Sequence, residues 1–108
     1  MPSIVAGDEH ATFINTFDVD PADQAEILAA LVETMEAAQR HPGFVSASAH
    51  PTLDGRRIFM YLQWETAQDL LDYQASTEFR ALMPRFAGVA GFTSQQCVVA
   101  HVAERTRS

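Results

Sequence analysis

The segment RIFMYLQWET at residues 57–66 carries large apolar side chains at most of its positions, and it constrains the fold more than any other stretch. Its aromatic and aliphatic residues predict a β-strand, in which neighbouring side chains point to opposite faces. One face would carry Ile58, Met60, Leu62 and Trp64. The other face would carry Phe59, Tyr61 and Gln63. A sheet that contains this strand therefore needs an apolar cover on both faces.

Other segments supply one of these covers. Further strands are predicted at residues 11–19, 43–50 and 93–104. A helix is predicted to begin at Pro21, with Asp20 as its N-cap, and to end near Arg40, because apolar residues recur at helical spacing between these points. Thr66 is expected to cap a second helical region that continues to residue 86.

The second and third strands are expected to form a hairpin around an Asp54-Gly55 turn. Strict alternation along residues 43–50 divides the second strand into two faces. One face holds Val45, Ala47 and Ala49, and the other holds Phe44, Ser46, Ser48 and His50.

The predicted order of elements is β-α-β-β-α-β. This order is typical of the ferredoxin-like α+β fold, a four-stranded antiparallel sheet with both helices on one face. The helices would cover one face of the 57–66 strand, and none of the other predicted elements remains to cover the second face. A second copy of the chain, packed sheet to sheet in a symmetric homodimer, is the simplest cover.

Composition is that of a single globular domain. A chain of 108 residues that is 47% hydrophobic can bury one core without a metal or a disulfide, and the lone Cys97 is expected to be a buried free thiol. A net charge of −7 argues against nucleic acid or an anionic membrane as a partner. The sequence contains no signal-peptide pattern and no membrane-length apolar run, so we expect a cytoplasmic protein. The domain is expected at 11–104, between a flexible arm at 1–10 and a frayed tail at 105–108.

Four stretches together resemble one known family. They are ATFINTFDVDP from residue 11, HPGFVSASAH from residue 41, YLQWETAQDLLDY from residue 61 and STEFRALM from residue 76. They resemble the antibiotic biosynthesis monooxygenase family over about residues 11–100. The resemblance implies a homodimeric α+β barrel in which two sheets pack together. Its polyketide branch implies an oxygenase that converts a bulky phenol or anthrone to a quinone with O₂ and without metal, haem or flavin.

The resemblance also implies a set of site residues. Trp64 matches a tryptophan that lines the substrate cavity of the family, although a lone tryptophan at a strand end is also a common core residue. Members that oxidise anthrones carry an asparagine four residues earlier, where this chain has Met60. Asn15, in the first strand, could supply the missing amide, or it could be an ordinary strand residue. Leu62 and Met83 are expected to contact the substrate.

Three further polar residues are candidates on the same ground. His50 matches a histidine that could act as a base. It could instead be a surface residue that precedes the turn and has no role in the site. Arg80 matches an arginine that could neutralise a phenolate. It could instead be a solvent-exposed residue of a short helix. Tyr73 is expected to face the substrate from the second helical region.

Two other functions compete with oxygenation of an aromatic. A dimeric barrel that binds a hydrophobic molecule without catalysis is favoured by Met60 at the amide position. Haem degradation is disfavoured, because Tyr73 and Met83 stand where the haem-degrading relatives have a tryptophan and an iron-ligating histidine. The four histidines have no metal-ligand spacing, so no metal site is predicted.

Overall fold

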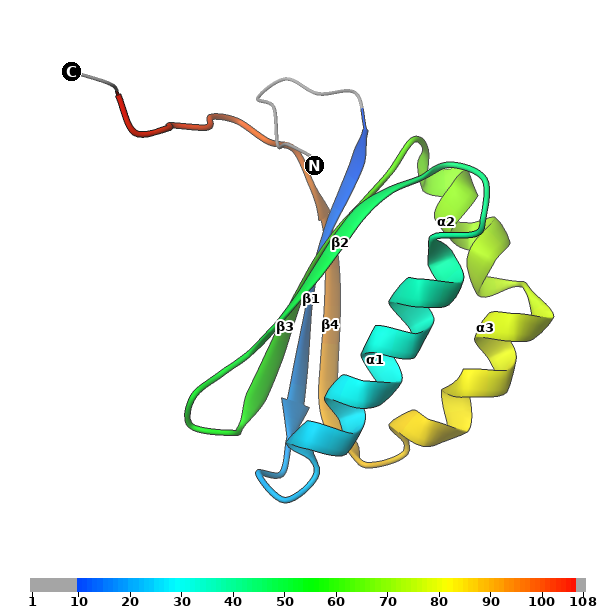
Figure 1. The fold of residues 1–108 in the computed structure, drawn as a ribbon, viewed down its shortest axis with the longest axis vertical. Coiled ribbons are helices and arrows are strands. Elements are labelled where there is room, and N and C mark those ends of the chain that lie inside the picture. Colours follow the sequence, from blue (N-terminus) through cyan, green and yellow to red (C-terminus); the bar gives the residue numbers. More distant parts are fainter. Residues whose placement is uncertain (1–9, 107–108) are drawn as a thin grey trace.

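The computed structural model describes residues 10–106, which form one sheet and a layer of helices (Figure 1). The elements are β1 (Ala11–Val19), α1 (Gln24–Ala38), β2 (Phe44–Pro51), β3 (Arg57–Trp64), α2 (Ala67–Gln74), α3 (Thr77–Leu82), the 3₁₀-helix η1 (Met83–Phe86) and β4 (Val89–Cys97). This order confirms the predicted ferredoxin-like α+β fold. The arm predicted at 1–10 lies outside the described residues except for His10.

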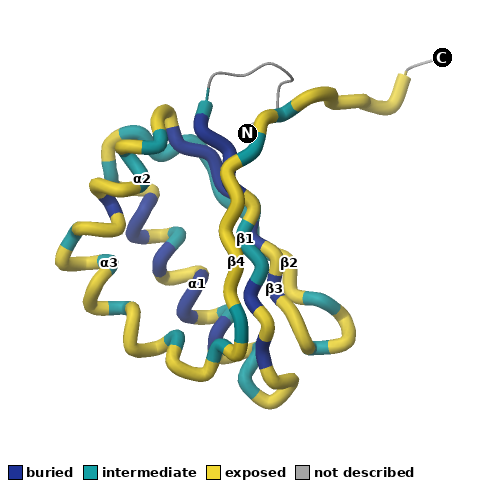
Figure 2. Tube along the Cα trace, turned by 180° about the vertical axis from the view of Figure 1, so that it is seen from behind, coloured by how far each residue is buried: buried dark blue, intermediate teal, exposed yellow. Residues whose placement is uncertain are grey.

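The four strands are antiparallel and lie in the order β2-β3-β1-β4. The helices all cover the same face of this sheet, and the buried residues of α1 are turned toward it (Figures 1 and 2). Strands β1 and β3 are therefore central, and β2 and β4 are the edges. In residues 10–106, no helix combines the length and the apolar composition needed to cross a membrane.

Strand β3 has the two apolar faces that its sequence predicts. The helix-covered face consists of buried Ile58, Met60, Leu62 and Trp64. On the opposite face, Phe59 is 40% exposed, and Ile14 of the neighbouring strand is 45% exposed. The structure therefore has a buried apolar face under the helices and a second face on which Phe59 and Ile14 are partly exposed, whereas Thr12 and Gln63 at one end of that face are buried.

Strand β2 departs from strict alternation near its start. Phe44 lies opposite Trp64, and Ala47 lies opposite Leu62, so three steps along β2 match two steps along β3. The extra residue is a β-bulge between Phe44 and Ser46, and it turns Phe44 to the same face as Ala47. The prediction that these two residues face opposite ways was wrong, and the consequence is an additional aromatic ring under the helices.

The last strand lies at Val89–Cys97 and not at the predicted 93–104. At its C-terminal end, Cys97 pairs with Thr12, one residue from the start of β1, so the ladder has almost no partner backbone beyond this point. Residues 98–106 have no regular structure and lead away from the sheet (Figure 1). Of the tail predicted at 105–108, only the first two residues are described, and both are exposed.

Helix α1 begins three residues later than predicted. The Asp20 side chain accepts a hydrogen bond from the Ala22 N–H at 2.9 Å, and its carbonyl oxygen accepts one from the Asp23 N–H at 2.8 Å. These bonds close a turn that contains Pro21, and Asp23 is the N-cap. The acidic residue and the proline therefore build the turn that enters the helix, and they lie outside the helix itself.

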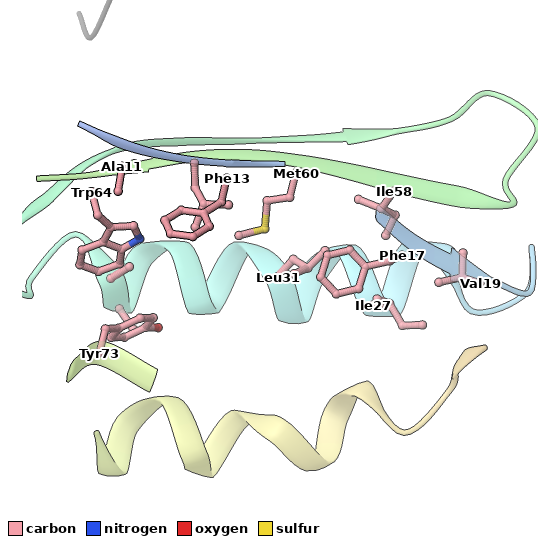
Figure 3. Packing of buried hydrophobic residues seen from close by; sticks show 13 residues of the cluster. Ala11, Phe13, Phe17, Val19, Ile27, Leu31, Ile58, Met60, Trp64 and Tyr73 are labelled. Atoms are coloured by element: carbon pink, nitrogen blue, oxygen red, sulfur yellow. The ribbon is translucent and has the colours of Figure 1, made fainter. Parts of the chain in front are cut away.

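The core fills the space between the sheet and α1 (Figure 3). Phe13, Phe17 and Met60 point from the sheet toward Leu31 and Ile27 of α1. Trp64 and Tyr73 lie together at one end of this layer, beside α2. The core therefore extends along α1, and Trp64 and Tyr73 form its aromatic end.

Candidate functional site

A cavity of about 390 Å³ lies between the helix-covered face of the sheet and the helices. Its sheet wall consists of Asn15, Phe17, Phe44, Ala47, Met60, Leu62, Trp64, Val89, Phe92 and Ser94. Its helical wall consists of Leu31, Thr34, Met35, Ala38, Leu70, Tyr73, Gln74, Phe79, Met83 and Phe86. Phe92 is 55% exposed although it lines the cavity, so the cavity opens to solvent beside β4. The volume and the apolar wall suit a small organic ligand.

Two side-chain caps position the short helices over the sheet. The Thr66 hydroxyl accepts a hydrogen bond from the Asp69 N–H at 3.1 Å and fixes the start of α2. The Ser76 hydroxyl accepts one from the Phe79 N–H at 3.2 Å and fixes the start of α3. Tyr73 and Phe79, on either side of the second cap, both line the cavity.

Aromatic rings form the closed end of the cavity around Trp64, which is 1% exposed. Tyr73 stacks on its indole with the ring centroids 5.6 Å apart, and Phe44 meets it edge-on at 5.4 Å. Phe79 packs edge-on against Tyr73 at 5.2 Å. Such offset and edge-on contacts hold each ring in a fixed orientation, so this end of the cavity presents a rigid aromatic slot, of which Figure 3 shows Trp64 and Tyr73.

The Tyr73 hydroxyl is occupied by a structural bond. It donates a hydrogen bond of 2.6 Å to the Thr34 carbonyl oxygen of α1. Burial, with a smaller contribution from the Glu78 carboxylate, raises the pKa of Tyr73 to about 12. The phenol therefore stays protonated at neutral pH. Tyr73 can shape the slot, but it is not suited to act as a base, because its hydroxyl is protonated at neutral pH and its proton is already donated to Thr34.

Two buried polar atoms in the cavity wall have no hydrogen-bond partner among the described residues. They are the indole Nε1 of Trp64 and the Oδ1 of Asn15. Leaving a buried polar group unpaired costs about 1–3 kcal/mol. One atom is a donor and the other an acceptor, so a ligand with a complementary acceptor and donor would recover this free energy on binding.

Asn15 lies between Met60 and Ser94 on the floor of the cavity. Its cross-strand neighbour on β3 is Met60, and its neighbour on β4 is Ser94. The amide therefore stands one strand away from the position where the resemblance expects an asparagine. This register was not visible in the sequence, and it also brings in Ser94, which the sequence did not single out.

The structure brings together most of the residues predicted for the site. Six of them line the cavity: Asn15, Met60, Leu62, Trp64, Tyr73 and Met83. His50 and Arg80 do not. His50 pairs with Phe59, on the sheet face away from the helices, and its Nε2 lies 2.8 Å from the Ser48 hydroxyl. Arg80 is exposed on α3 and is not part of the cavity wall.

No charged side chain lines the cavity among the described residues. The nearby ionic groups pair with one another on the outside of the helices. Arg40 and His41 both contact Glu78, and Arg85 pairs with Glu33. Within residues 10–106, no group of three His, Cys, Asp or Glu side chains is placed to hold a metal ion. The cavity therefore offers hydrogen bonds from neutral groups only.

Comparison with known proteins places the chain in a family. Residues 11–85 match the antibiotic biosynthesis monooxygenase family, and the chain belongs to it. The chain is similar to tetracenomycin-F1 monooxygenase of Streptomyces glaucescens, with 36% identity over 87 residues that cover 80% of this chain and 75% of that protein.

Solved structures share the fold at lower sequence identity. An antibiotic biosynthesis monooxygenase of Nitrosomonas europaea superposes with a TM-score of 0.77 at 14% identity, covering 88% of this chain and 94% of that one. A variant of SnoaB from Streptomyces nogalater, described as a cofactor-independent oxygenase, gives a TM-score of 0.69 at 19% identity, covering 92% of this chain and 97% of that one.

The Tyr73 contacts predict a loss of stability at high pH. The folded protein holds the phenol protonated up to a pKa of about 12, whereas the ordinary value is 10.0. The unfolded chain therefore loses this proton first, and the free energy of unfolding should fall as the pH rises from 10 toward 12. Urea unfolding across this range measures the effect. A Tyr73→Phe variant should lose this component of the pH dependence, and an unchanged slope in that variant would contradict the assignment.

Proposed function

We propose that this protein is a cofactor-independent monooxygenase that oxidises a bulky, polyketide-type phenol or anthrone to a quinone with O₂ as co-substrate. One observation carries the proposal: Trp64, in the wall of an apolar, aromatic cavity, has a buried indole N–H for which no described residue supplies an acceptor. Membership of the family and the similarity to a tetracenomycin-F1 monooxygenase support it.

The reaction balances without an added reductant. An anthrone methylene group loses a proton, and the resulting anion passes one electron to O₂. The carbon radical and superoxide combine to form a C–O bond, and protonation gives a hydroperoxide. Loss of water from this carbon leaves the quinone carbonyl. One oxygen atom of O₂ enters the product, the other leaves as water, and all four electrons come from the substrate.

The cavity residues support this chemistry by binding and by electrostatics. Trp64 Nε1–H would donate to the substrate oxygen that gains negative charge when the anthrone ionises, which stabilises the anion in a site of low dielectric constant. Asn15 Oδ1 would accept a hydrogen bond from a phenolic hydroxyl and fix the register of the rings. Phe44 and Tyr73 hold the plane of the Trp64 indole that donates the first of these bonds. The proton would leave to solvent through the mouth beside β4, since no cavity side chain is placed as a base.

We also propose that the uncovered sheet face binds a second copy of the chain. Phe59 and Ile14 are large apolar residues on this face. A second sheet packed against this face would cover the exposed apolar side chains of Phe59 and Ile14.

Substitution of Trp64 is the direct test of the oxygenase. Trp64→Phe keeps an aromatic ring and removes the N–H, and we expect it to lower kcat/KM for dithranol oxidation roughly 10²-fold, the usual cost of one lost oxyanion donor. Quinone formation by metal-free protein in aerated buffer measures the rate. Arg80→Ala and His50→Ala are matched controls outside the cavity and should change the rate less than about twofold. Wild-type protein that binds dithranol without oxidising it would favour the binding-only alternative.

Asn15 and Met60 are cross-strand neighbours, so an amide at position 60 should compensate for the loss of the amide at position 15. Asn15→Ala should lower kcat/KM about tenfold, because one hydrogen bond to the substrate is lost. Adding Met60→Asn to that variant returns an amide to the adjacent strand and should restore most of the rate. Steady-state kinetics of the two single variants and the double variant measure the coupling. Additive losses would show that the amide does not act on the substrate.

The dimer is tested by a charge on the sheet face. Phe59→Asp should convert the protein to a monomer, because a symmetric interface would bury two unpaired carboxylates. Leu53→Asp, at a fully exposed position of the 52–55 turn, is the matched control and should stay dimeric. Sedimentation velocity distinguishes the two states. A monomeric wild type, or a dimeric Phe59→Asp variant, would refute the interface.

A further inference from the structure

The three methionines of the described residues, Met35, Met60 and Met83, all line the cavity. We propose that Met60 is a modification site, at which a hydroperoxide formed from the bound substrate passes an oxygen atom to the thioether, and that the resulting methionine sulfoxide ends turnover. The inference rests on the proposed function for the source of the hydroperoxide. The choice of Met60 among the three methionines rests on its burial and on its place in β3.

Met60 lies along the cavity from the unpaired indole N–H. It shares the helix-covered face of β3 with Trp64, and the four residues between their positions correspond to about 13 Å along a strand. In Figure 3 the indole nitrogen lies on the side of the Trp64 ring nearer to Met60, and the Met60 sulfur points from the sheet toward the helices. A ring system bound to the indole N–H would therefore extend toward the Met60 thioether.

The chemistry of an anthrone directs the peroxide to the same place. The carbonyl oxygen gains the negative charge when the anthrone ionises, and the methylene carbon that reacts with O₂ lies on the opposite side of the central ring. With this oxygen held by the Trp64 N–H, the reacting carbon points away from Trp64. A hydrogen bond of about 2.9 Å, the central ring and the peroxide group together cover most of the distance between Trp64 and Met60.

Oxygen transfer to sulfur competes with the loss of water that gives the quinone. The thioether sulfur attacks the distal oxygen of the hydroperoxide, so that an S–O bond forms and the O–O bond breaks. The proton of the distal oxygen passes to the proximal oxygen. Sulfur is oxidised by two electrons, and the hydroperoxide is reduced to an alcohol. Each event therefore consumes one O₂, gives a hydroxyanthrone in place of the quinone, and adds one oxygen atom to Met60.

Burial makes Met60 a poor target for oxidants that come from the solvent. Its side chain is 9% exposed, whereas Met83, at the start of η1, is 36% exposed. Oxidation of methionine follows exposure, so an oxidant in solution should reach Met83 first. An oxidant formed or held inside the cavity should instead reach Met60 first. The order in which the two residues are oxidised therefore identifies the source of the oxidant.

Mass spectrometry after turnover tests the proposal. Cleavage after arginine places Met60 in the peptide 58–80 and Met83 in the peptide 81–85, so the two are measured separately. Dithranol is oxidised under ¹⁸O₂, with catalase present to remove hydrogen peroxide from the solution. We expect ¹⁸O in Met60 at a level at least about fivefold above that in Met83, and the reverse order when hydrogen peroxide is added to resting protein. Quinone formation without ¹⁸O in Met60 would overturn the proposal and leave the oxygenase intact.

Methionine sulfoxide at position 60 should limit the number of turnovers. It would place a polar acceptor directly across from Asn15 and change the hydrogen bonding of the substrate. Met60→Leu keeps an apolar side chain of similar volume, so it should form at least about threefold more quinone per protein before activity stops. Met83→Leu is the matched control and should stop as early as the wild type. Equal yields from wild type and Met60→Leu would show that this modification does not end turnover.

An aromatic hydroperoxide tests the site without any oxygenase activity. Cumene hydroperoxide is neutral and carries its peroxide on an aromatic group, so it should enter the apolar cavity. Added to resting protein without dithranol, it should oxidise Met60 before Met83, and saturation with the quinone chrysophanol should protect Met60 only. Oxidation of Met83 before Met60 by both peroxides would overturn the proposal. Because this experiment needs no turnover, it decides the modification site even if dithranol is not oxidised.

Discussion

The stacking of Trp64 between the sheet and the second helical region is the contact on which the cavity depends. Trp64 ends β3, Phe44 reaches it from the bulge in β2, and Tyr73 covers it from α2. Tyr73 is in turn fixed to α1 by its hydrogen bond to Thr34. The Trp64 indole of β3 thus contacts β2 and α2 directly, and Tyr73 links it to α1. Its rigidity sets the shape of the closed end of the cavity, and the open end faces solvent beside β4.

The same contact leaves a buried donor that a hydrogen-bond acceptor in the cavity would satisfy. The indole N–H is buried, its residue lines the cavity, and none of the described residues accepts its hydrogen bond. Stable proteins rarely leave such groups unpaired. The Asn15 oxygen is in the same condition a short distance along the sheet. An unpaired donor and an unpaired acceptor in one apolar cavity are typical of a site built for recognition, where unmet hydrogen bonds provide specificity.

The sequence predicts the parts of this site that follow from simple periodicity. The pairing of β3 with β1 has no bulge, so the shared face of Met60, Leu62 and Trp64 could be read directly from alternation, although burial of Gln63 on the other face could not. The turn signals and N-caps gave the order of elements. Phe44 could not be placed, because a single bulge reverses its face and bulges have no reliable sequence signal. The role of Asn15 depended on strand register, which is a long-range property.

Two predicted polar residues lie outside the cavity for similar reasons. His50 follows the bulge, and its pairing with Phe59 directs it to the uncovered face. Arg80 lies on a helix of six residues, too short for a hydrophobic pattern to define its buried side. Both residues were predicted from matching positions in the family, which do not specify the direction of either side chain. Their absence from the wall leaves a cavity of neutral groups, so the proposed chemistry depends on hydrogen bonds to the substrate and not on a cation.

The central claim is that a ligand oxygen accepts the hydrogen bond of the Trp64 indole. Because the chain has one tryptophan, a ¹⁵N-labelled sample gives one indole N–H signal in a heteronuclear NMR spectrum. Saturation with a neutral hydroxyanthraquinone such as chrysophanol should move its proton resonance downfield and slow its exchange with solvent, since a buried hydrogen bond to a carbonyl or phenolic oxygen forms. An indole signal that keeps its proton shift and its exchange rate while the ligand fills the cavity would contradict the account.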